Sequence, residues 1–128
     1  MADVFGSPPT ESLIAANAEY LEHTGAYDFY VAEIDGEPVG CGAVCYSREM
    51  PSPDNPSGRC AYLMNIYVRE AWRRRGVGHA IVRRLIEIAR ESGCDKIYLE
   101  TTDGARSFYR SIGFNELPGI MKYADIHD

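Results

Sequence analysis

The stretch REAWRRRGVGHAIVRRLIEIARESG, residues 69–93, decides the fold. Three consecutive arginines lead into Gly76-Val77-Gly78, and apolar residues then recur at helical spacing: Ile81, Val82, Leu85, Ile86, Ile88 and Ala89. Charged residues take the opposite side of the same pattern, as in a helix with one buried face. The sequence therefore predicts a helix that starts after Gly78 and ends at Gly93, since glycine is common just past a helix C-terminus.

Extended segments flank this helix. Residues 60–68 form a nearly continuous apolar run, typical of a central strand, and residues 96–101 form a second extended run. A helix between two such strands favours a parallel pair. Residues 27–34 and 39–46 surround Asp35-Gly36, so they predict a β-hairpin.

The remaining segments complete a mixed sheet. Residues 11–23 predict a helix, residues 105–112 a short helix, and residues 120–124 a last strand, whereas residues 1–10 read as loosely ordered. The expected fold class is α/β, with a mixed sheet and one βαβ unit, in a single domain over residues 1–128.

Composition narrows the classes of function. A chain of 128 residues fits one domain, and 45% apolar with 25% charged residues is typical of a globular protein. A net charge of −6 disfavours nucleic-acid binding, and no apolar run reaches the ~20 residues that cross a bilayer. The four cysteines, at 41, 45, 60 and 94, lack metal-ligand spacing, so no metal is expected. Without a secretion signal, a cytoplasmic location is expected.

The arginine-glycine segment predicts an anion site. A strand that leads through Gly76 and Gly78 into a helix presents main-chain N–H groups and the positive end of the helix dipole. Arg73, Arg74 and Arg75 add charge, so a diphosphate is the natural ligand. The spacing is neither Gly-x-Gly-x-x-Gly nor a Walker loop. Two alternatives stay open: a strand-to-helix turn with a solvated basic patch, and a nucleotide-binding protein unrelated to acyl transfer.

The chain resembles the GNAT N-acetyltransferase superfamily in three ordered motifs. Residues 73–78 resemble its Arg/Gln-x-x-Gly-x-Gly/Ala signature, and ARSFYRSIGF, residues 105–114, is similar to its last helix. The hairpin FYVAEIDGEPVGCGAVCY, residues 29–46, resembles its second and third strands. The resemblance implies the GNAT (acyl-CoA N-acyltransferase) fold and acetyl-CoA as co-substrate.

The resemblance also implies which residues hold acetyl-CoA. Main-chain groups from Arg74 to His79, with Val77 between the glycines, would hold the pyrophosphate. Ile66, Tyr67 and Val68 would contact the pantetheine arm or polarise the thioester carbonyl. Many relatives carry an asparagine at the position of Thr102, so the contact there is expected to be weaker or made differently.

Acetyl transfer needs a proton donor and a base. The resemblance makes Tyr109 the general acid for the departing thiolate. Histone-acetylating relatives carry a glutamate eleven positions before the signature, where this chain has Tyr62. Glu33 and Glu100 are the candidate bases, acting through water.

One departure concerns the start of the chain. The family's usual first strand and helix are expected to be absent here, which would leave an unpaired sheet edge and favour a homodimer. The expected function is transfer of acetyl from acetyl-CoA to a primary amine, on a small molecule or a peptide. The alternative is a CoA-binding sensor or partner-regulating domain with weak catalysis.

Overall fold

A computed structural model describes residues 27–124 of the 128-residue chain. Its strands are β1 (Tyr27–Ile34), β2 (Glu37–Arg48), β3 (Arg59–Val68) and β4 (Lys96–Tyr98). Its helices are α2 (Val77–Glu91), α3 (Arg106–Ile112) and two 3-10 turns, η1 (Glu70–Trp72) and η2 (Asp103–Ala105). The helix expected at residues 11–23 and the question of an earlier strand lie outside the described residues.

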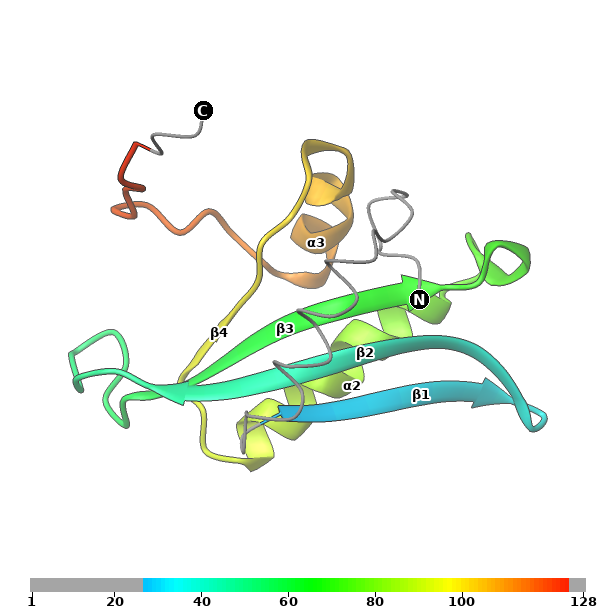
Figure 1. The fold of residues 1–128 in the computed structure, drawn as a ribbon, viewed down its shortest axis with the longest axis horizontal. Coiled ribbons are helices and arrows are strands. Elements are labelled where there is room, and N and C mark those ends of the chain that lie inside the picture. Colours follow the sequence, from blue (N-terminus) through cyan, green and yellow to red (C-terminus); the bar gives the residue numbers. More distant parts are fainter. Residues whose placement is uncertain (1–26, 125–128) are drawn as a thin grey trace.

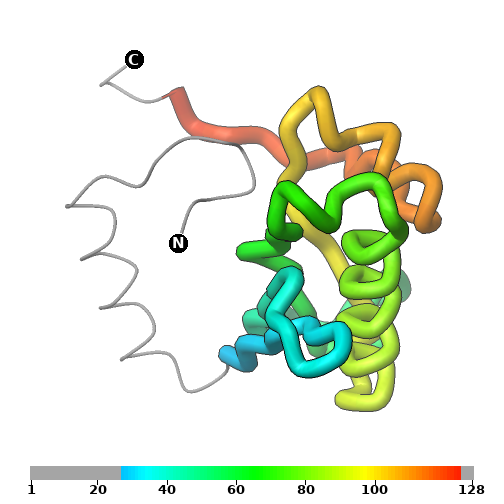
Figure 2. Tube along the Cα trace, turned by 90° about the vertical axis from the view of Figure 1, so that its right-hand side faces the viewer, coloured from blue at the N-terminus to red at the C-terminus, as the bar shows by residue number. Residues whose placement is uncertain are grey.

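The four strands form one mixed sheet in the order β1-β2-β3-β4 (Figure 1). β1 and β2 form the predicted antiparallel hairpin, with Asp35 and Gly36 at positive φ in the turn. β3 pairs with β2 in antiparallel fashion and with β4 in parallel fashion, so the predicted βαβ unit is confirmed. α2 lies on one side of the strands (Figure 2).

The core lies between α2 and the sheet. Val39, Val44 and Leu63 of the sheet meet Val82 and Leu85 of α2, and all five are almost completely buried. Burying each such side chain contributes about 1.5–3 kcal/mol of hydrophobic stabilisation. Helix and sheet approach closely at Gly42, where a Cβ atom would stand 2.9 Å from Leu85 Cδ1.

Two sequence predictions need correction at the C-terminal end. The strand expected at residues 96–101 ends at Tyr98, because β4 turns away from β3 beyond that point. The strand expected at residues 120–124 is wrong: this segment has no strand partner among the described residues, and Ile120, Met121 and Tyr123 are largely exposed. A β-prone pattern without a neighbouring strand edge forms no ladder.

Candidate functional site

The parallel strands β3 and β4 separate like the arms of a fork. Their register consists of three pairs, which end at Tyr62↔Tyr98, while β3 continues to Val68 (Figure 1). Arg69 N–H donates to the Val39 carbonyl over 2.8 Å, so Arg69 turns its main chain toward β2. Main-chain groups alternate along a strand, so those of Val68 and Ile66 face the open side of the fork.

A β-bulge bends β3 within this open stretch. The register shifts between Cys41 and Ala43 of β2, where β3 has one extra residue. Asn65 takes a positive φ of 54°, which asparagine tolerates better than most residues, and its Nδ2 donates to Tyr27 Oη over 3.1 Å. The bulge therefore fixes the part of β3 that borders the fork.

The N-terminus of α2 lies uncapped beyond the end of β3. Its first helical hydrogen bond runs from Ala80 N–H to the Gly76 carbonyl, and the N-cap residue Gly76 offers no side chain. Within residues 27–124, no main-chain N–H from residue 74 to residue 79 has a hydrogen-bond acceptor. Such groups, together with the helix dipole, favour an anion.

The loop before α2 holds two residues in the left-handed region. Arg74 has φ of 62° and Gly76 has φ of 82°. A non-glycine residue in this region costs about 1 kcal/mol or more, so such strain is typical of binding loops. A Cβ atom at Gly76 would meet nothing within 4 Å, so backbone conformation rather than space requires glycine there.

The arginine side chains are partly engaged by the protein itself. Arg73 Nε donates to the Val68 carbonyl over 3.0 Å, and its guanidinium lies 5.5 Å from the centre of the Tyr67 ring. Arg75 lies 5.1 Å from the centre of the Trp72 ring, and that half-buried ring packs against the core. These contacts orient two guanidinium groups beside the open N–H groups.

The first turn of α2 is packed against α3. A Cβ atom at Gly78 would lie 3.4 Å from the Phe108 ring and 3.5 Å from Val68, so the residue has little room for a larger side chain. His79 Nδ1 accepts a hydrogen bond from Arg83 Nε over 3.1 Å, which leaves its proton on Nε2. The His79 ring also meets Phe108 edge to face.

Tyr109 of α3 is a buried tyrosine that lines a groove beside β4. It is 8% exposed, and its ring packs edge to face against Phe108 and Phe114. Burial raises the pKa of the Tyr109 hydroxyl above its usual value, so this group keeps its proton at neutral pH. Tyr109 and Glu100 both line a groove of about 840 Å³ between α2, β4 and the segment after α3.

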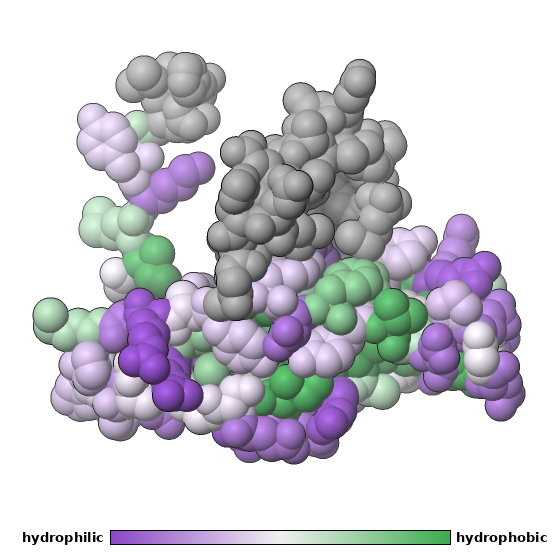
Figure 3. Space-filling model, turned by 60° about the horizontal axis from the view of Figure 1, so that its bottom comes forward, coloured by the Kyte–Doolittle hydropathy of each residue, from purple (hydrophilic) through white to green (hydrophobic). Residues whose placement is uncertain are grey.

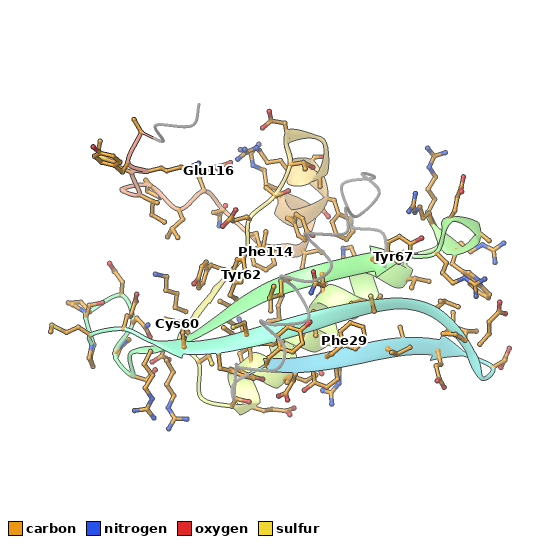
Figure 4. The ribbon with its side chains drawn as sticks, viewed as in Figure 1. Phe29, Cys60, Tyr62, Tyr67, Phe114 and Glu116 are labelled. Atoms are coloured by element: carbon orange, nitrogen blue, oxygen red, sulfur yellow. The ribbon has the colours of Figure 1, made fainter. Side chains whose placement is uncertain are left out.

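Tyr62, Tyr98 and Glu100 meet at the point where the fork opens. The Tyr62 and Tyr98 rings lie 5.1 Å apart, and the Glu100 side chain lies near Tyr62 (Figure 4 labels Tyr62). Burial and then the nearby Glu100 charge raise the pKa of Tyr62, which keeps the hydroxyl protonated and able to donate. The position where the resemblance expects a glutamate in histone-acetylating relatives thus lies near a carboxylate from the segment after β4.

The structure separates the two candidate bases. Glu100 lies at the fork, whereas Glu33 is exposed near the hairpin turn, opposite Pro38. Glu33 is six positions along β1 from Tyr27, a distance of about 20 Å. Tyr27 and Tyr62 both pair with Cys45, so they lie in one row of the sheet. Thr102 caps η2 by accepting a hydrogen bond from Ala105 N–H over 3.3 Å.

The described part of the chain contains neither a metal site nor a disulfide. Within it, no group of three or more His, Cys, Asp or Glu side chains is arranged to hold a metal, and the four cysteines form no disulfide. None of the helices described is both long enough and apolar enough to cross a membrane.

Sequence reasoning missed two features of this site. The bulge at Asn65 had no signal beyond an asparagine inside an apolar strand. The contact between Tyr62 and Glu100 had a partial signal, since Tyr62 stands where relatives carry a base. Its partner depends on the register of β3 and β4, which the sequence does not specify.

Comparisons with known proteins agree with this geometry. Residues 2–114 match the model of the acetyltransferase (GNAT) family. The chain is 33% identical over 109 residues to bovine thialysine N-epsilon-acetyltransferase, covering 80% of this chain and 64% of the relative. It is 35% identical over 114 residues to rice glucosamine 6-phosphate N-acetyltransferase 1, covering 86% and 67%. The chain thus spans about two thirds of the length of these curated relatives.

A solved structure shares the fold. A predicted acetyltransferase from Clostridium acetobutylicum, crystallised with acetyl-CoA, superposes with a TM-score of 0.75 at 21% identity, covering 92% of this chain and 78% of that one. The forked strands and the uncapped helix thus belong to a known architecture. With the family match spanning most of its length, the chain belongs to the GNAT acetyltransferase family.

Proposed function

We propose that the protein transfers the acetyl group of acetyl-CoA to a primary amine by direct attack in a ternary complex. The observation that carries this proposal is the uncapped N-terminus of α2 beside the open fork of β3 and β4. One feature offers anion-binding N–H groups and the other offers an unpaired strand edge, so together they match a ligand with a diphosphate and an amide-bearing arm.

The donor would lie along main-chain groups. The N–H groups of residues 74–79 bind the pyrophosphate, with Arg73, Arg74 and Arg75 adding charge. The pantetheine amides pair with the main chain of Ile66 and with the Val68 N–H at the fork, because the Val68 carbonyl accepts from Arg73. The Ile66 N–H polarises the thioester carbonyl, since the main chain of Tyr67 faces β2. The Thr102 side chain caps η2, whereas many relatives carry an asparagine here that contacts pantetheine. Fewer side chains therefore bind the pantetheine arm.

The transfer needs three proton movements. An alkyl ammonium ion first loses a proton to the Glu100 carboxylate, through water, because the attacking nitrogen needs its lone pair. The nitrogen then forms a bond to the thioester carbon, the carbon–sulfur bond breaks, and the leaving thiolate takes the hydroxyl proton of Tyr109, whose raised pKa keeps that proton available. The nitrogen still carries one proton more than the amide product, and this proton passes through water to the Tyr109 oxygen, which restores the hydroxyl.

Both curated relatives described above are named as acetyltransferases, which favours catalysis over the CoA-sensing alternative. Their acceptors differ, one being named for thialysine and the other for glucosamine 6-phosphate. The shared chemistry is a primary amine, and the proposal takes that class for this protein.

The direct test is release of free thiol from acetyl-CoA with a panel of primary amines. We expect thiol release that depends on the amine and yields the acetylated amine in equal amount. Calorimetry with CoA runs in parallel. CoA binding without turnover of any amine would contradict the enzymatic proposal and leave the sensing alternative.

Dimerisation and a cytoplasmic location stay predictions. Within residues 27–124, the outer edge of β1 has no strand partner, and Phe29, Val31 and Ile34 of this strand are 45%, 52% and 38% exposed. Figure 3 turns the β1 side of the molecule forward and shows separate hydrophobic clusters between hydrophilic residues. Sedimentation equilibrium at micromolar concentration tests the dimer, and a monomer there would contradict it.

A further inference from the structure

Charge is distributed unevenly along the chain. All 13 lysines and arginines lie at or after Arg48, so residues 1–47 carry neither. The same 47 residues contain these acidic side chains: Asp3, Glu11, Glu19, Glu22, Asp28, Glu33, Asp35 and Glu37. Whatever position residues 1–26 take, they bring no lysine or arginine to bind an anion. The hairpin of β1 and β2 brings none before Arg48.

The sheet face opposite α2 is aromatic and almost uncharged. A Cβ atom at Gly40 or Gly42 would point at Ile81 of α2, so Cys41, Ala43 and Cys45 turn to the opposite face. Their cross-strand partners share that face: Tyr27, Phe29, Val31, Tyr62, Met64 and Tyr67. Tyrosine rings of this kind attract cations through their π faces.

The fork end of this face carries a carboxylate. Glu100 is exposed and lies beside Tyr62, whose pKa is raised by burial and then by the Glu100 charge. Glu100 forms no ion pair with any residue from 27 to 124. Lys96 lies on the same side, but its ammonium is paired with Glu49 over 3.1 Å. An alkyl ammonium ion therefore finds a carboxylate there that has no competing partner among the described residues.

The protein itself shows how an alkyl ammonium group sits at this end. Lys96 Nζ lies 5.2 Å from the centre of the Tyr98 ring, and Tyr98 packs against Tyr62. The guanidinium of Arg73 lies over Tyr67, five residues along β3 from Tyr62, which is the partner of Tyr98. The groove that Glu100 lines also carries Arg83, Arg90, Arg106 and Arg110, of which Arg106 and Arg110 are paired with Glu116. On the aromatic face, the α2 end carries an arginine beside the N–H groups of the helix, whereas the carboxylate at the fork end has no ion-pair partner among residues 27–124.

From this arrangement we infer that the acceptor is an aliphatic primary amine on an uncharged or cationic chain, and that acceptors with a phosphate or carboxylate are disfavoured. The reacting nitrogen lies beside Glu100 and Tyr62, and the chain runs along the aromatic face. The inference rests on the proposed function, because it assigns the amine side of the same reaction. It distinguishes a lysine-like amine from a phosphorylated amino sugar.

A matched set of amines tests the inference by binding, independently of turnover. The set is 1,5-diaminopentane, 5-aminopentan-1-ol and 5-aminopentanoic acid, which share the reacting amine and differ in the charge at the far end. Calorimetry with CoA-saturated protein should give about tenfold tighter binding of the diamine than of the acid, with the alcohol between them. Equal binding of all three, or tighter binding of the acid or of glucosamine 6-phosphate, would overturn the inference.

Variants test whether the preference for the diamine arises at Glu100 and Tyr62. Glu100→Gln should weaken diamine binding about fivefold and reduce the preference over the acid. Glu91→Gln removes the same charge from the exposed surface of α2 and should leave the preference unchanged. Tyr62→Phe keeps the ring and should retain more of the diamine affinity than Tyr62→Leu. An unchanged preference in Glu100→Gln would refute the assignment to this site.

Thiol release with the same amines separates the two proposals. If the diamine binds preferentially but no amine is acetylated, the proposed function fails and the recognition of cationic amines stands. If amines are acetylated with no preference for the cationic chain, the function stands and the inference about the acceptor is wrong.

Discussion

The two sides of the candidate site are built from different parts of the chain. The proposed donor side consists of main-chain groups from one continuous segment, residues 74–79, and from the adjacent edge of β3. The acceptor side consists of side chains that β1, β3 and β4 bring together across the sheet. Main-chain binding depends on backbone conformation, so the glycines that permit this conformation can be recognised in the sequence. Side-chain binding depends on register, and single substitutions can redirect it.

Tyr109→Phe should give the largest effect, since Tyr109 is the proposed proton donor for the leaving thiolate. The variant keeps the ring packed against Phe108 and Phe114 but loses the proton donor, so kcat should fall about 10³-fold. CoA affinity, measured by calorimetry, should change less than about twofold because main-chain groups provide it. An unchanged kcat would rule out Tyr109 as the acid.

The pH dependence gives a second test of the same residue. Burial raises the pKa of Tyr109 above the usual value near 10, so the hydroxyl stays protonated at pH 7–9. The rate of wild-type enzyme should therefore show no decline from this group below about pH 10. A decline at lower pH that disappears in Tyr109→Phe would contradict the raised pKa.

Glu100→Gln tests whether Glu100 is the base on the acceptor side. The variant loses the base at the fork, so kcat/KM for the amine should fall about 10²-fold while the affinity for CoA is retained. Glu33→Gln makes the same chemical change about 20 Å along β1 and should have a much smaller effect. Steady-state kinetics on both variants decide the matter, and a larger loss in Glu33→Gln would reverse the assignment.

Gly76→Val tests the donor side through the backbone. A β-branched residue is strained at φ of 82°, so the loop should rearrange and CoA affinity should fall about tenfold. Gly36→Val is the matched control, since Gly36 has φ of 81° but lies in the hairpin turn. It should lose comparable stability yet bind CoA normally. Equal loss of CoA binding in both variants would mean that the effect is general destabilisation.

Thr102→Val should give the smallest effect. The variant removes the side-chain cap of η2, which costs about 1 kcal/mol of the free energy of unfolding. Thermal unfolding should shift down by a few degrees, with CoA affinity nearly unchanged. A loss of CoA affinity larger than the loss of stability would restore a direct contact between Thr102 and the pantetheine arm.

The sequence predicted the local structure around the proposed donor side better than that around the acceptor side, for physical reasons. The amphipathic pattern of α2 is local, so residues 73–93 reveal the helix, which starts at Val77 rather than after Gly78. The αL conformation at Gly76 was not predicted. The end of β4 at Tyr98 and the contact between Tyr62 and Glu100 depend on how two distant strands diverge. No local pattern encodes that divergence, so Glu33 and Glu100 were equivalent until the sheet separated them.

The central claim is that main-chain N–H groups at the start of α2 bind the diphosphate of CoA. A ¹⁵N-labelled sample titrated with CoA and followed by amide NMR tests it most directly. The account predicts the largest amide shifts at residues 74–79, with smaller shifts at Ile66 and Val68. Saturable CoA binding that leaves the amides of residues 74–79 unshifted would contradict it.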